Sequence, residues 1–439
     1  MKQPQKYYIR TYGCQMNELD SEVMSGVLER RGLNKTEVEE EADLLIFNTC
    51  SIRDLAERKV MGKLGQLGRR KEMREKIIGI TGCMANAKKG NLFHKIPFID
   101  FILGTNNYHQ LDQVLDDVIA GRQQVIHTDE KFSFELDYMR AKRDDKTRAY
   151  VSIIRGCDKY CTYCVVPYTR GSEVSRHPDE IVEEVKKLAA AGYQEVCLLG
   201  QNVNSYGKDT PEWKTFFHDL LYRLDKETDI PWIRFLTSHP VDISRQLMEA
   251  IRDLPSLCEM VHFPLQAGSD RILKKMHRIY TVEEYMKKVA LLREIVPGVS
   301  LGTDIIVGFP TETNEDFEET YRLMEQIEYS VAYLYTYSQR KGTPAMRWKD
   351  DVPEEIKEER LQRLTRLQNG IYQKQRQNMF GEVVEVLVDG IAKDGDLHGK
   401  TRCWKNTVFA GDRALIGTRQ KVKMTGYSHN TLLASLYRT

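Results

Sequence analysis

Residues 156–164 read GCDKYCTYC, a loop in which three cysteines are spaced four and three residues apart. The loop follows the first of six strand-like runs that alternate with helical patterns: AYVSIIRG, QEVCLLG, WIRFLTS, CEMVHFPLQ, VSLGTDIIVGF and VAYLYTY. Six such units predict an incomplete parallel (β/α)6 barrel, whose catalytic groups lie at the carboxyl ends of the strands and in the loops that follow. The three-cysteine loop occupies that position after the first strand.

The three thiols of this loop, Cys157, Cys161 and Cys164, are more typical of a metal site than of core packing. Structural zinc usually takes four protein ligands, but the nearest histidine is His177 and no second Cys or His pair follows. A complete ferredoxin motif would add a fourth cysteine close by, where residues 165–167 read VVP instead. Three ligands therefore leave one iron of a cubane cluster open.

A second pattern occurs three times near the N-terminus, where YYIRTYGC, DLLIFNTC and IIGITGC each end a strand-like run in a cysteine. These cysteines are Cys14, Cys50 and Cys83. Strands alternating with helices predict a parallel sheet, and its ligand sites lie beyond the carboxyl ends of the strands. We therefore expect an N-terminal parallel α/β sandwich domain that brings the three thiols to one crevice, although a lone cysteine at a strand end is usually a small buried hydrophobe.

The helix limits in this region are predicted from capping signals. Asp20 or Ser21 is a plausible N-cap for the helix after the first cysteine, and Gly32 is its stop. Ser51 with Asp54 resembles the start of a capping box, and predicts a charged helix that runs to about residue 74.

The remaining segments predict a linker, a long helix and a small β-barrel. The polar stretch EKFSFELDYMRAKRDDKTRAY is the linker, and a helix beginning at VPEEIKEERL leads to residues 381–439, which alternate polar and apolar positions. This last segment has nine Lys and Arg against six Asp and Glu, with exposed-looking Trp404 and Tyr427. It is suited to gripping RNA by phosphate attraction and stacking, and an ordinary solvated surface explains the charge equally well.

The composition is that of a soluble enzyme, with 439 residues, 41% hydrophobic, 29% charged and a net charge of +1. It gives no charge bias toward a polyanionic partner, and the chain shows neither a signal peptide nor a run of about 18 apolar residues. We expect a cytoplasmic protein. The other cysteines, Cys197, Cys258 and Cys403, lie within predicted strands, where burial explains them.

The C-x-x-x-C-x-x-C loop resembles that of the radical S-adenosylmethionine (SAM) enzymes, and the wider set of motifs resembles the radical methylthiotransferases. That set is TYGCQMNE, NTCSIR, GCDKYCTYCVVPYTRG, LLGQNVNSYG, TSHP, PLQAGSDRIL and DIIVGFPTET, and the match runs from about residue 7 to the last strand. The resemblance implies an N-terminal methylthiotransferase domain at residues 5–125, a radical SAM core at 143–375 and a TRAM domain, the small β-barrel, at 376–439.

The resemblance also implies the cofactors. Cys157, Cys161 and Cys164 would hold the radical-generating 4Fe-4S cluster, whose open iron binds S-adenosylmethionine. The three N-terminal cysteines would hold an auxiliary 4Fe-4S cluster, whose open iron can carry a sulfur atom for insertion into an unactivated C–H bond. Each turnover would use two molecules of S-adenosylmethionine, one for methylation and one for the radical.

The implied reaction is methylthiolation of carbon 2 of isopentenyladenosine, at position 37 of tRNA. The implied partners are the tRNA anticodon stem-loop and an electron donor such as flavodoxin or ferredoxin, with the enzyme acting as a monomer. Related enzymes of the family modify threonylcarbamoyladenosine in tRNA or an aspartate of a ribosomal protein. A non-catalytic RNA-binding protein holding clusters or zinc is the alternative from another class.

The residues that bind the methionine moiety are less clearly marked, because LGQNVN stands where a Gly-Gly-Glu run often follows the second barrel strand. Gln201 or Asn202 is a candidate there. Polar residues at other strand ends are further candidates for cofactor binding, although each is equally well explained as an ordinary strand terminus: Ser238, Gln266 and Asp304. Arg340, after the sixth strand, is a candidate for contacting substrate, and an exposed arginine is at least as good an explanation.

Overall fold

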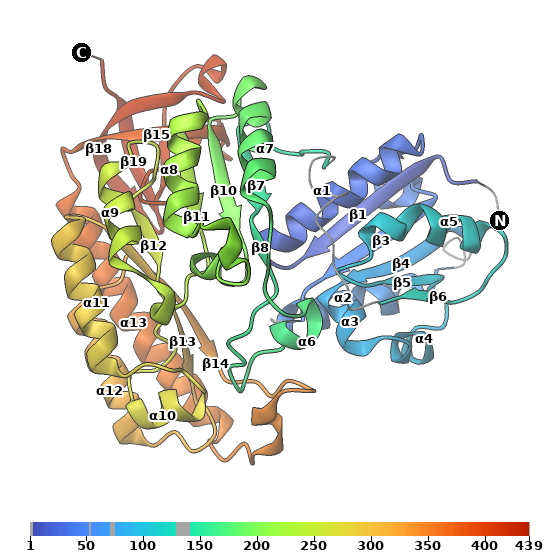
Figure 1. Cartoon of the computed structure of the whole chain (residues 1–439), viewed down its shortest axis with the longest axis horizontal. Helices are drawn as coiled ribbons and strands as arrows, with labels where there is room; N and C mark the ends of the chain where they lie inside the picture. The colour runs from blue at the N-terminus through green and yellow to red at the C-terminus, as the bar shows by residue number, and fades with distance from the viewer. Residues whose placement is uncertain (1–2, 52–53, 71–74, 129–140, 439) are drawn as a thin grey trace.

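The computed structural model of the chain describes residues 3–51, 54–70, 75–128 and 141–438. It contains three units, namely an N-terminal α/β sheet, a central incomplete barrel and a C-terminal closed barrel (Figure 1). The N-terminal sheet and the C-terminal barrel contact different sides of the central unit. The predicted fold class is confirmed in all three parts.

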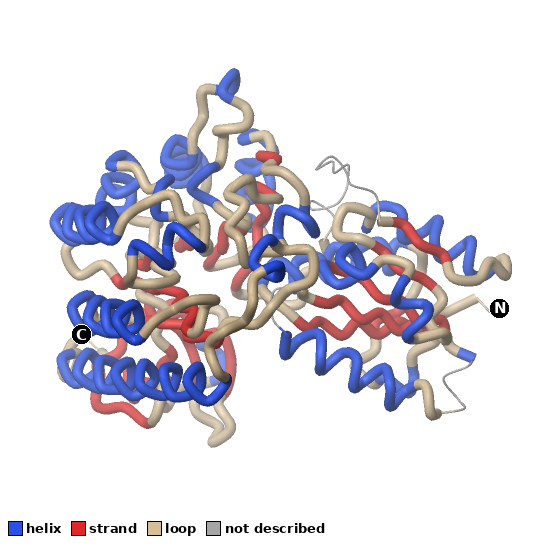
Figure 2. Tube along the Cα trace, turned by 90° about the horizontal axis from the view of Figure 1, so that it is seen from below, coloured by secondary structure: helices blue, strands red, loops and turns tan. Residues whose placement is uncertain are grey.

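The N-terminal sheet is parallel and has the strand order β2-β1-β3-β4-β5-β6. Its strands are β1 (Lys6–Tyr12), β2 (Asn34–Lys35), β3 (Leu44–Thr49), β4 (Ile77–Gly82), β5 (Phe101–Leu103) and β6 (Val125–His127). Its helices are α1 (Gln15–Arg30), α2 (Asp54–Leu67), α3 (Cys83–Lys88), α4 (Asn91–Lys95) and α5 (Leu111–Ile119). Helices cover both faces of the sheet (Figure 2), so β3 and β4 are buried along their whole length and read as apolar runs.

Helix α1 starts earlier than its capping signals predicted. Cys14 is the N-cap, and Asp20 and Ser21 lie inside the helix, where both are buried. The N-cap prediction is wrong because these two side chains have distant partners: Asp20 pairs with Arg170, and Ser21 accepts a hydrogen bond from Asn48. The predicted stop is confirmed, since Gly32 follows the helix with a φ of +91° that favours glycine.

Helix α2 ends at Leu67, short of the predicted end near residue 74. The residue after it, Gly68, lies so close to Phe98 that an added Cβ would come 2.5 Å from the ring. The predicted end of this helix, together with residues 52–53 and most of the predicted linker, lies outside the described residues.

The central unit contains six parallel strands in two groups, β11-β10-β7 and β12-β13-β14. A bridge between Ile233 and Leu257 joins the groups, so the six predicted strands form one incomplete barrel. The strands of this unit, with the β8–β9 ribbon, are β7 (Arg148–Ser152), β8 (Ile154–Arg155), β9 (Val174–Ser175), β10 (Glu195–Leu199), β11 (Trp232–Phe235), β12 (Met260–His262), β13 (Ser300–Val307) and β14 (Val331–Thr336).

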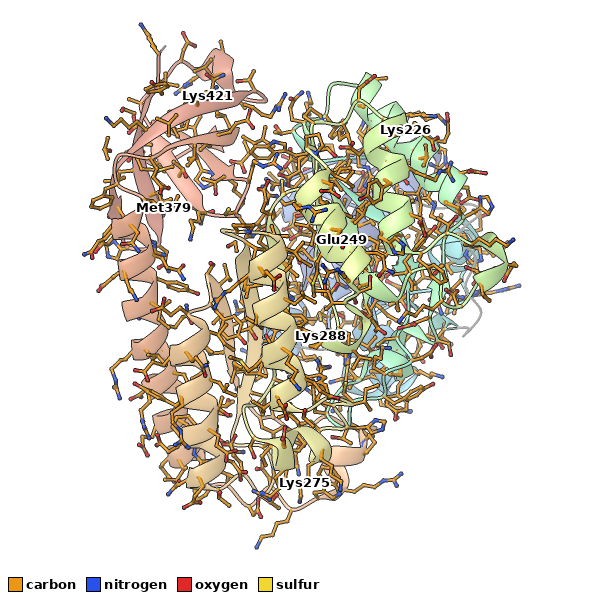
Figure 3. The ribbon with its side chains drawn as sticks, turned by 60° about the vertical axis from the view of Figure 1, so that its left-hand side comes forward. Lys226, Glu249, Lys275, Lys288, Met379 and Lys421 are labelled. Carbon is orange, nitrogen blue, oxygen red and sulfur yellow. The ribbon has the colours of Figure 1, made fainter. Side chains whose placement is uncertain are left out.

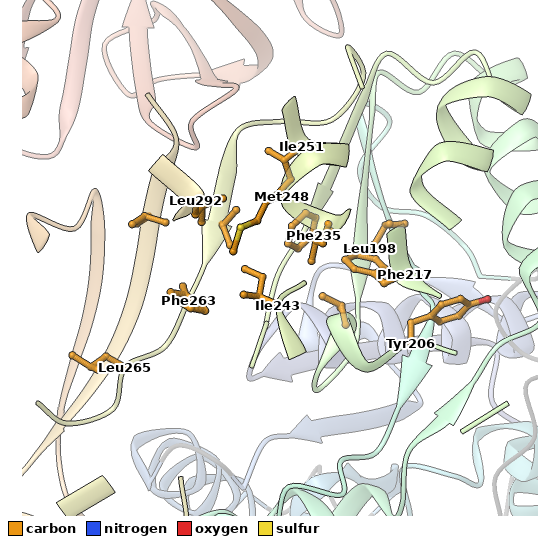
Figure 4. Packing of buried hydrophobic residues seen from close by; sticks show 14 of the residues in the cluster. Leu198, Tyr206, Phe217, Phe235, Ile243, Met248, Ile251, Phe263, Leu265 and Leu292 are labelled. Atoms are coloured by element: carbon orange, nitrogen blue, oxygen red, sulfur yellow. The ribbon is translucent and has the colours of Figure 1, made fainter. Parts of the chain in front are cut away.

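Helices surround these strands on the outside. They are α7 (Pro178–Ala190), α8 (Phe217–Glu227), α9 (Arg245–Asp253), α10 (Asp270–Lys275), α11 (Val282–Ile295), α12 (Asn314–Ile327) and α13 (Glu354–Asn378). The short helix α6 (Val166–Arg170) instead contacts α3 of the N-terminal unit (Figure 1). Lys226, Glu249 and Lys288 mark the outer layer formed by α8, α9 and α11 (Figure 3). Apolar side chains such as Phe235 and Met248 fill the space between helices and strands (Figure 4).

Helix α1 packs against the face of β10 that the outer helices of the central unit do not cover. Its Met16 and Leu19 belong to the same buried cluster as Cys197 and Leu199 of β10. The N-terminal sheet is therefore held to the central barrel by an apolar interface.

Helix α13 ends next to Met379 and leads into the C-terminal barrel (Figure 3). The strands are β15 (Val383–Ile391), β16 (Leu397–Thr401), β17 (Asn406–Phe409), β18 (Arg419–Ser428) and β19 (Thr431–Leu436), closed in the order β15-β16-β17-β19-β18. The predicted small barrel is confirmed.

Trp404 of this barrel is not the exposed platform that the sequence suggested. Its ring lies 5.0 Å from the Arg148 guanidinium and 4.8 Å from that of Arg234, both in the central unit. Arg234 also donates to the carbonyl of Thr401 at 2.8 Å. Cation–π contacts therefore fix the barrel to the central unit, and the tryptophan is used for this contact.

None of the helices in the described ranges combines the length and the apolar character that a membrane crossing requires.

Candidate metal centres

Three cysteines follow adjacent strands of the N-terminal sheet, and we call them the dispersed set: Cys14, Cys50 and Cys83. Strands β1, β3 and β4 are parallel neighbours, with Tyr12 aligned to Thr49 and Thr49 aligned to Gly82. The cysteines come one or two residues after these aligned positions, so their backbones lie at the same edge of the sheet. The crevice predicted from the repeated pattern is therefore present.

Close backbone packing shapes this edge. Gly82 has a φ of +89°, and an added Cβ there would lie 2.5 Å from the Thr49 carbonyl oxygen. Cys14 donates from Sγ to Asn17 Oδ1 at 3.3 Å, and Asn17 in turn donates to Asn48 Oδ1 at 3.1 Å. The crevice is thus preformed by backbone and amide contacts that do not involve a ligand.

The electrostatic environment of Cys14 favours its thiolate. Contact with the Cys50 side chain lowers the pKa of Cys14 to about 6, despite burial, and the charge of Arg170 acts in the same direction. A thiolate is the form that ligates iron.

The local set is Cys157, Cys161 and Cys164, in the loop between β8 and α6. The loop is held by hydrogen bonds from Cys157 N to the Gly171 carbonyl at 3.1 Å and from Cys164 N to the Cys161 carbonyl at 3.0 Å. Burial raises the pKa of Cys157 and of Cys164 to about 12. These two thiols therefore stay protonated at neutral pH unless a cation displaces the protons.

Each set supplies three thiols, the number of protein ligands that a cubane cluster with one open iron takes. Across residues 3–51, 54–70, 75–128 and 141–438, no three His, Cys, Asp or Glu side chains converge closely enough to hold one metal ion. The three thiolates of a cubane each bind a different iron, so they spread over the cube instead of meeting at a point. The three thiols of each set are the donors that such an arrangement uses.

Polar atoms without partners mark the adjacent part of the barrel. Ser238 Oγ, Asn202 Oδ1 and His239 Nε2 are buried and find no hydrogen-bond partner in the described part of the chain. The loops after β10 and β11 that carry them are joined by a hydrogen bond from Val203 N to the Thr237 carbonyl at 3.0 Å. Burial, reinforced by the Arg278 charge, lowers the pKa of His239 to about 2, so its ring is neutral. Such orphaned groups are expected where a polar ligand binds.

The predicted cofactor residues occupy different environments. Gln201 Oε1 accepts from the Gly156 amide at 2.7 Å, which ties the loop after β10 to the start of the local set. Gln266 is buried with a φ of +73°, a conformation that L residues seldom adopt. Asp304 Oδ2 lies 3.2 Å from His262 Nε2, and Arg340 is partly exposed in the loop after β14.

Two buried arginines near the cysteines were not anticipated from the sequence. Arg278 Nη1 donates to Cys161 Sγ at 3.4 Å, and its Nε donates to the Tyr280 hydroxyl at 3.0 Å. Arg170, at the end of α6, pairs with Asp20 of α1 at 2.8 Å. In the sequence these arginines are marked only by their positions: Arg278 begins RIY after a helix, and Arg170 lies in YTRG after the local set. Burial was not expected for either, because charged residues are seldom buried without a partner.

The profile of the Uncharacterized protein family UPF0004 matches residues 6–104, and that of the Radical SAM superfamily matches residues 151–324. A tRNA-2-methylthio-N(6)-dimethylallyladenosine synthase of Protochlamydia amoebophila (strain UWE25) is 66% identical over 438 residues, which cover 99% of this chain and 97% of that protein. The protein of the same name from Thermoanaerobacter pseudethanolicus is 46% identical over 427 residues, covering 95% and 90% of the two chains.

Among solved structures, the chain is similar to the radical S-adenosylmethionine methyltransferase TsrM from Kitasatospora setae. The TM-score is 0.57 at 14% identity, with 78% of this chain and 75% of that chain covered. The cobalamin-dependent S-adenosylmethionine radical enzyme OxsB gives a TM-score of 0.54 at 10% identity, covering 83% and 56% of the two chains. At these identities the similarity shows a shared fold alone.

Proposed function

This chain belongs to the MiaB family of radical S-adenosylmethionine methylthiotransferases that act on tRNA, and we propose that it methylthiolates carbon 2 of isopentenyladenosine at position 37. The single observation that carries the proposal is the pairing of two three-cysteine sets, one following aligned parallel strands of the N-terminal sheet and one in the loop after β8. One set suits the generation of a radical and the other suits the supply of sulfur.

The local set would hold a 4Fe-4S cluster and S-adenosylmethionine, and the dispersed set would hold an auxiliary 4Fe-4S cluster. When bound, the first supplies an electron that cleaves S-adenosylmethionine to a carbon radical, and the second supplies sulfur. Two molecules of S-adenosylmethionine would be used per turnover. The chain itself would contribute the thiolates and position them.

The residues of the barrel would orient S-adenosylmethionine. Ser238 Oγ has no hydrogen-bond partner within the described ranges and is available to a polar group of the cofactor, and the neutral ring of His239 lies in the same loop. Gln201 would support the cofactor site indirectly, by positioning the cysteine loop, because its Oε1 already accepts a hydrogen bond from the Gly156 amide. Gln266 and Asp304 remain candidates for cofactor contacts, from the loop after β12 and from β13.

Substrate recognition would come from Arg340 and the C-terminal TRAM barrel. The exposed face of that barrel carries Lys421 and Lys423 of β18, which suit phosphate attraction. We assign residues 5–125, 143–375 and 376–439 to the three domains. An electron donor such as flavodoxin or ferredoxin, a monomeric state and a cytoplasmic location complete the proposal.

The deciding experiment incubates anaerobically reconstituted protein with an isopentenylated anticodon stem-loop and with the same stem-loop lacking the isopentenyl group. We expect a mass increase corresponding to a methylthio group on the isopentenylated nucleoside only. Modification of a threonylcarbamoyl substrate instead would assign the chain to another branch of the family. Absence of S-adenosylmethionine cleavage would favour a non-catalytic role.

A further inference from the structure

Arg170 comes from the central unit but reaches into the N-terminal one. It is the last residue of α6, which begins two residues after Cys164, and its side chain is 1% exposed. Its Nη2 donates to Asp20 Oδ2 at 2.8 Å, and Asp20 on α1 is fully buried. Burying a guanidinium is costly unless several of its five N–H groups are used.

The end of α6 is held firmly against the N-terminal sheet. The Thr169 carbonyl accepts from Asn86 Nδ2 at 2.6 Å and from Thr105 Oγ1 at 2.9 Å. Asn86 lies on α3, three residues after Cys83. The arginine is therefore fixed in place next to the dispersed set by bonds that do not involve its own side chain.

The other edge of the guanidinium has no protein partner. Arg170 Nη1 is buried and makes no hydrogen bond to any described residue. The helix that begins at Cys83 is bonded to the residue before this arginine, through Asn86 and the Thr169 carbonyl, so the guanidinium lies beside the dispersed set. An N–H group of a charged side chain that is buried without an acceptor is expected where a ligand binds.

We propose that Arg170 is a positioning residue of the auxiliary cluster, with its Nη1 edge donating to a cluster sulfur or to the sulfur carried on the open iron. This inference rests on the proposed function, because it requires a cluster on the dispersed set. The radical half of the molecule thereby completes the environment of the sulfur-supplying half. Asp20 orients the guanidinium from the opposite edge.

The charges of this pair predict opposite effects on the auxiliary cluster. Hydrogen bonds and positive charge near cluster sulfurs stabilise the reduced, more negative state and raise the reduction potential. Loss of the Arg170 charge should therefore lower the potential, whereas loss of the Asp20 charge should raise it. A role limited to interdomain ion pairs predicts no such opposition: Arg170→Gln removes one pair, and Asp20→Asn removes that pair together with the Arg155–Asp20 pair at 3.6 Å, so both changes only weaken the contact between the units.

The test uses the full chain with Cys157→Ala, Cys161→Ala and Cys164→Ala as the parent, so that only the auxiliary cluster can form. Arg170→Gln, Arg170→Lys and Asp20→Asn are added separately, and the midpoint potential is measured by anaerobic redox titration monitored by electron paramagnetic resonance. We expect a lower potential for Arg170→Gln, a smaller decrease for Arg170→Lys, and a higher potential for Asp20→Asn.

Arg176→Gln is the matched control. Arg176 is equally buried, and its ion-pair partners are Glu180 and Glu184 of α7. The control should lower the melting temperature without changing the potential. Equal potentials in the parent and Arg170→Gln, or shifts of the same sign in Arg170→Gln and Asp20→Asn, would overturn the inference alone. A parent that takes up no iron would overturn the proposed function and the inference with it.

Discussion

The local and dispersed cysteine sets present similar donors but are assembled in different ways. The local set lies within nine consecutive residues, and two backbone hydrogen bonds shape its loop. The dispersed set spans 70 residues of sequence, from position 14 to position 83, and meets only because β1, β3 and β4 are adjacent and in register. The first set depends on a loop and the second depends on a fold.

This difference has energetic consequences. Bringing together ligands that are far apart in sequence costs more chain entropy, which the packing of the sheet must offset. Damage to the sheet should therefore affect the dispersed set first. Damage to the loop should remove the local set and leave the sheet intact.

The largest effect is expected for Cys161→Ala, which removes one ligand of the local set. Only two thiolates would remain, and the Arg278 donor to Cys161 Sγ would lose its acceptor. Formation of 5′-deoxyadenosine after anaerobic reduction should fall to the background level. Iron per chain should decrease from about eight to about four, since each cubane contains four. Undiminished 5′-deoxyadenosine would contradict the assignment of the radical site.

Cys50→Ala is the corresponding change in the dispersed set. We expect loss of methylthiolated nucleoside while cleavage of S-adenosylmethionine continues, because the local set is untouched. Iron should again decrease to about four per chain. If the variant still made the methylthio product, the role of this set in supplying sulfur would be wrong. Together with the preceding variant, it separates the two functions.

Gly82→Ala tests whether the dispersed set depends on the fold of the sheet. The φ of +89° and the 2.5 Å approach of an added Cβ to the Thr49 carbonyl both oppose a side chain. We expect a loss of about 1–3 kcal/mol in unfolding free energy, measured by urea titration, because such backbone strain has that cost. Iron of the dispersed set should be lost in part, while 5′-deoxyadenosine formation is retained.

The matched control for this variant is Gly32→Ala. Its φ of +91° imposes the same type of strain, but an added Cβ would meet nothing within 4 Å. It should cost about 1 kcal/mol and leave the iron content unchanged. Equal iron loss in both glycine variants would show that general destabilisation, and not the shape of the crevice, releases the cluster.

The same contrast explains what could be predicted from the sequence. The local set could be recognised from the spacing of its cysteines. The dispersed set could be recognised because a strand followed by a cysteine occurs three times, and because parallel strands end at the same edge of a sheet. The partners of the cysteines were not visible, since no local pattern connects position 20 with position 170 or position 161 with position 278. The contact between Asp20 and Arg170 is fixed by how two units dock, and that between Cys161 and Arg278 by how two loops of the central unit pack.

Two errors in prediction have the same origin. Asp20 has the residue type of an N-cap, but tertiary contacts bury it inside α1. Trp404 belongs to a positively charged module, which favoured an exposed position, but it is enclosed by Arg148 and Arg234 of the central unit. Local preference was overridden in both cases by a buried guanidinium from another part of the chain.

The smallest effect is expected for Cys197→Ala. This variant tests whether a cysteine becomes a cluster ligand because of where it lies in the fold. Cys197 lies in the middle of β10, aligned with Tyr150 and Arg234 on the neighbouring strands, and it is fully buried between the strand and α1. Its side chain points into an interface and not toward a strand end, so it should hold no iron. We expect an unchanged iron content, unchanged 5′-deoxyadenosine formation and a loss of about 1 kcal/mol in unfolding free energy from the small cavity. Loss of iron in this variant would mean that a cysteine in the middle of a strand can bind a cluster. The placement of the local set in a loop and of the dispersed set at the edge of a sheet would then no longer explain which cysteines are ligands.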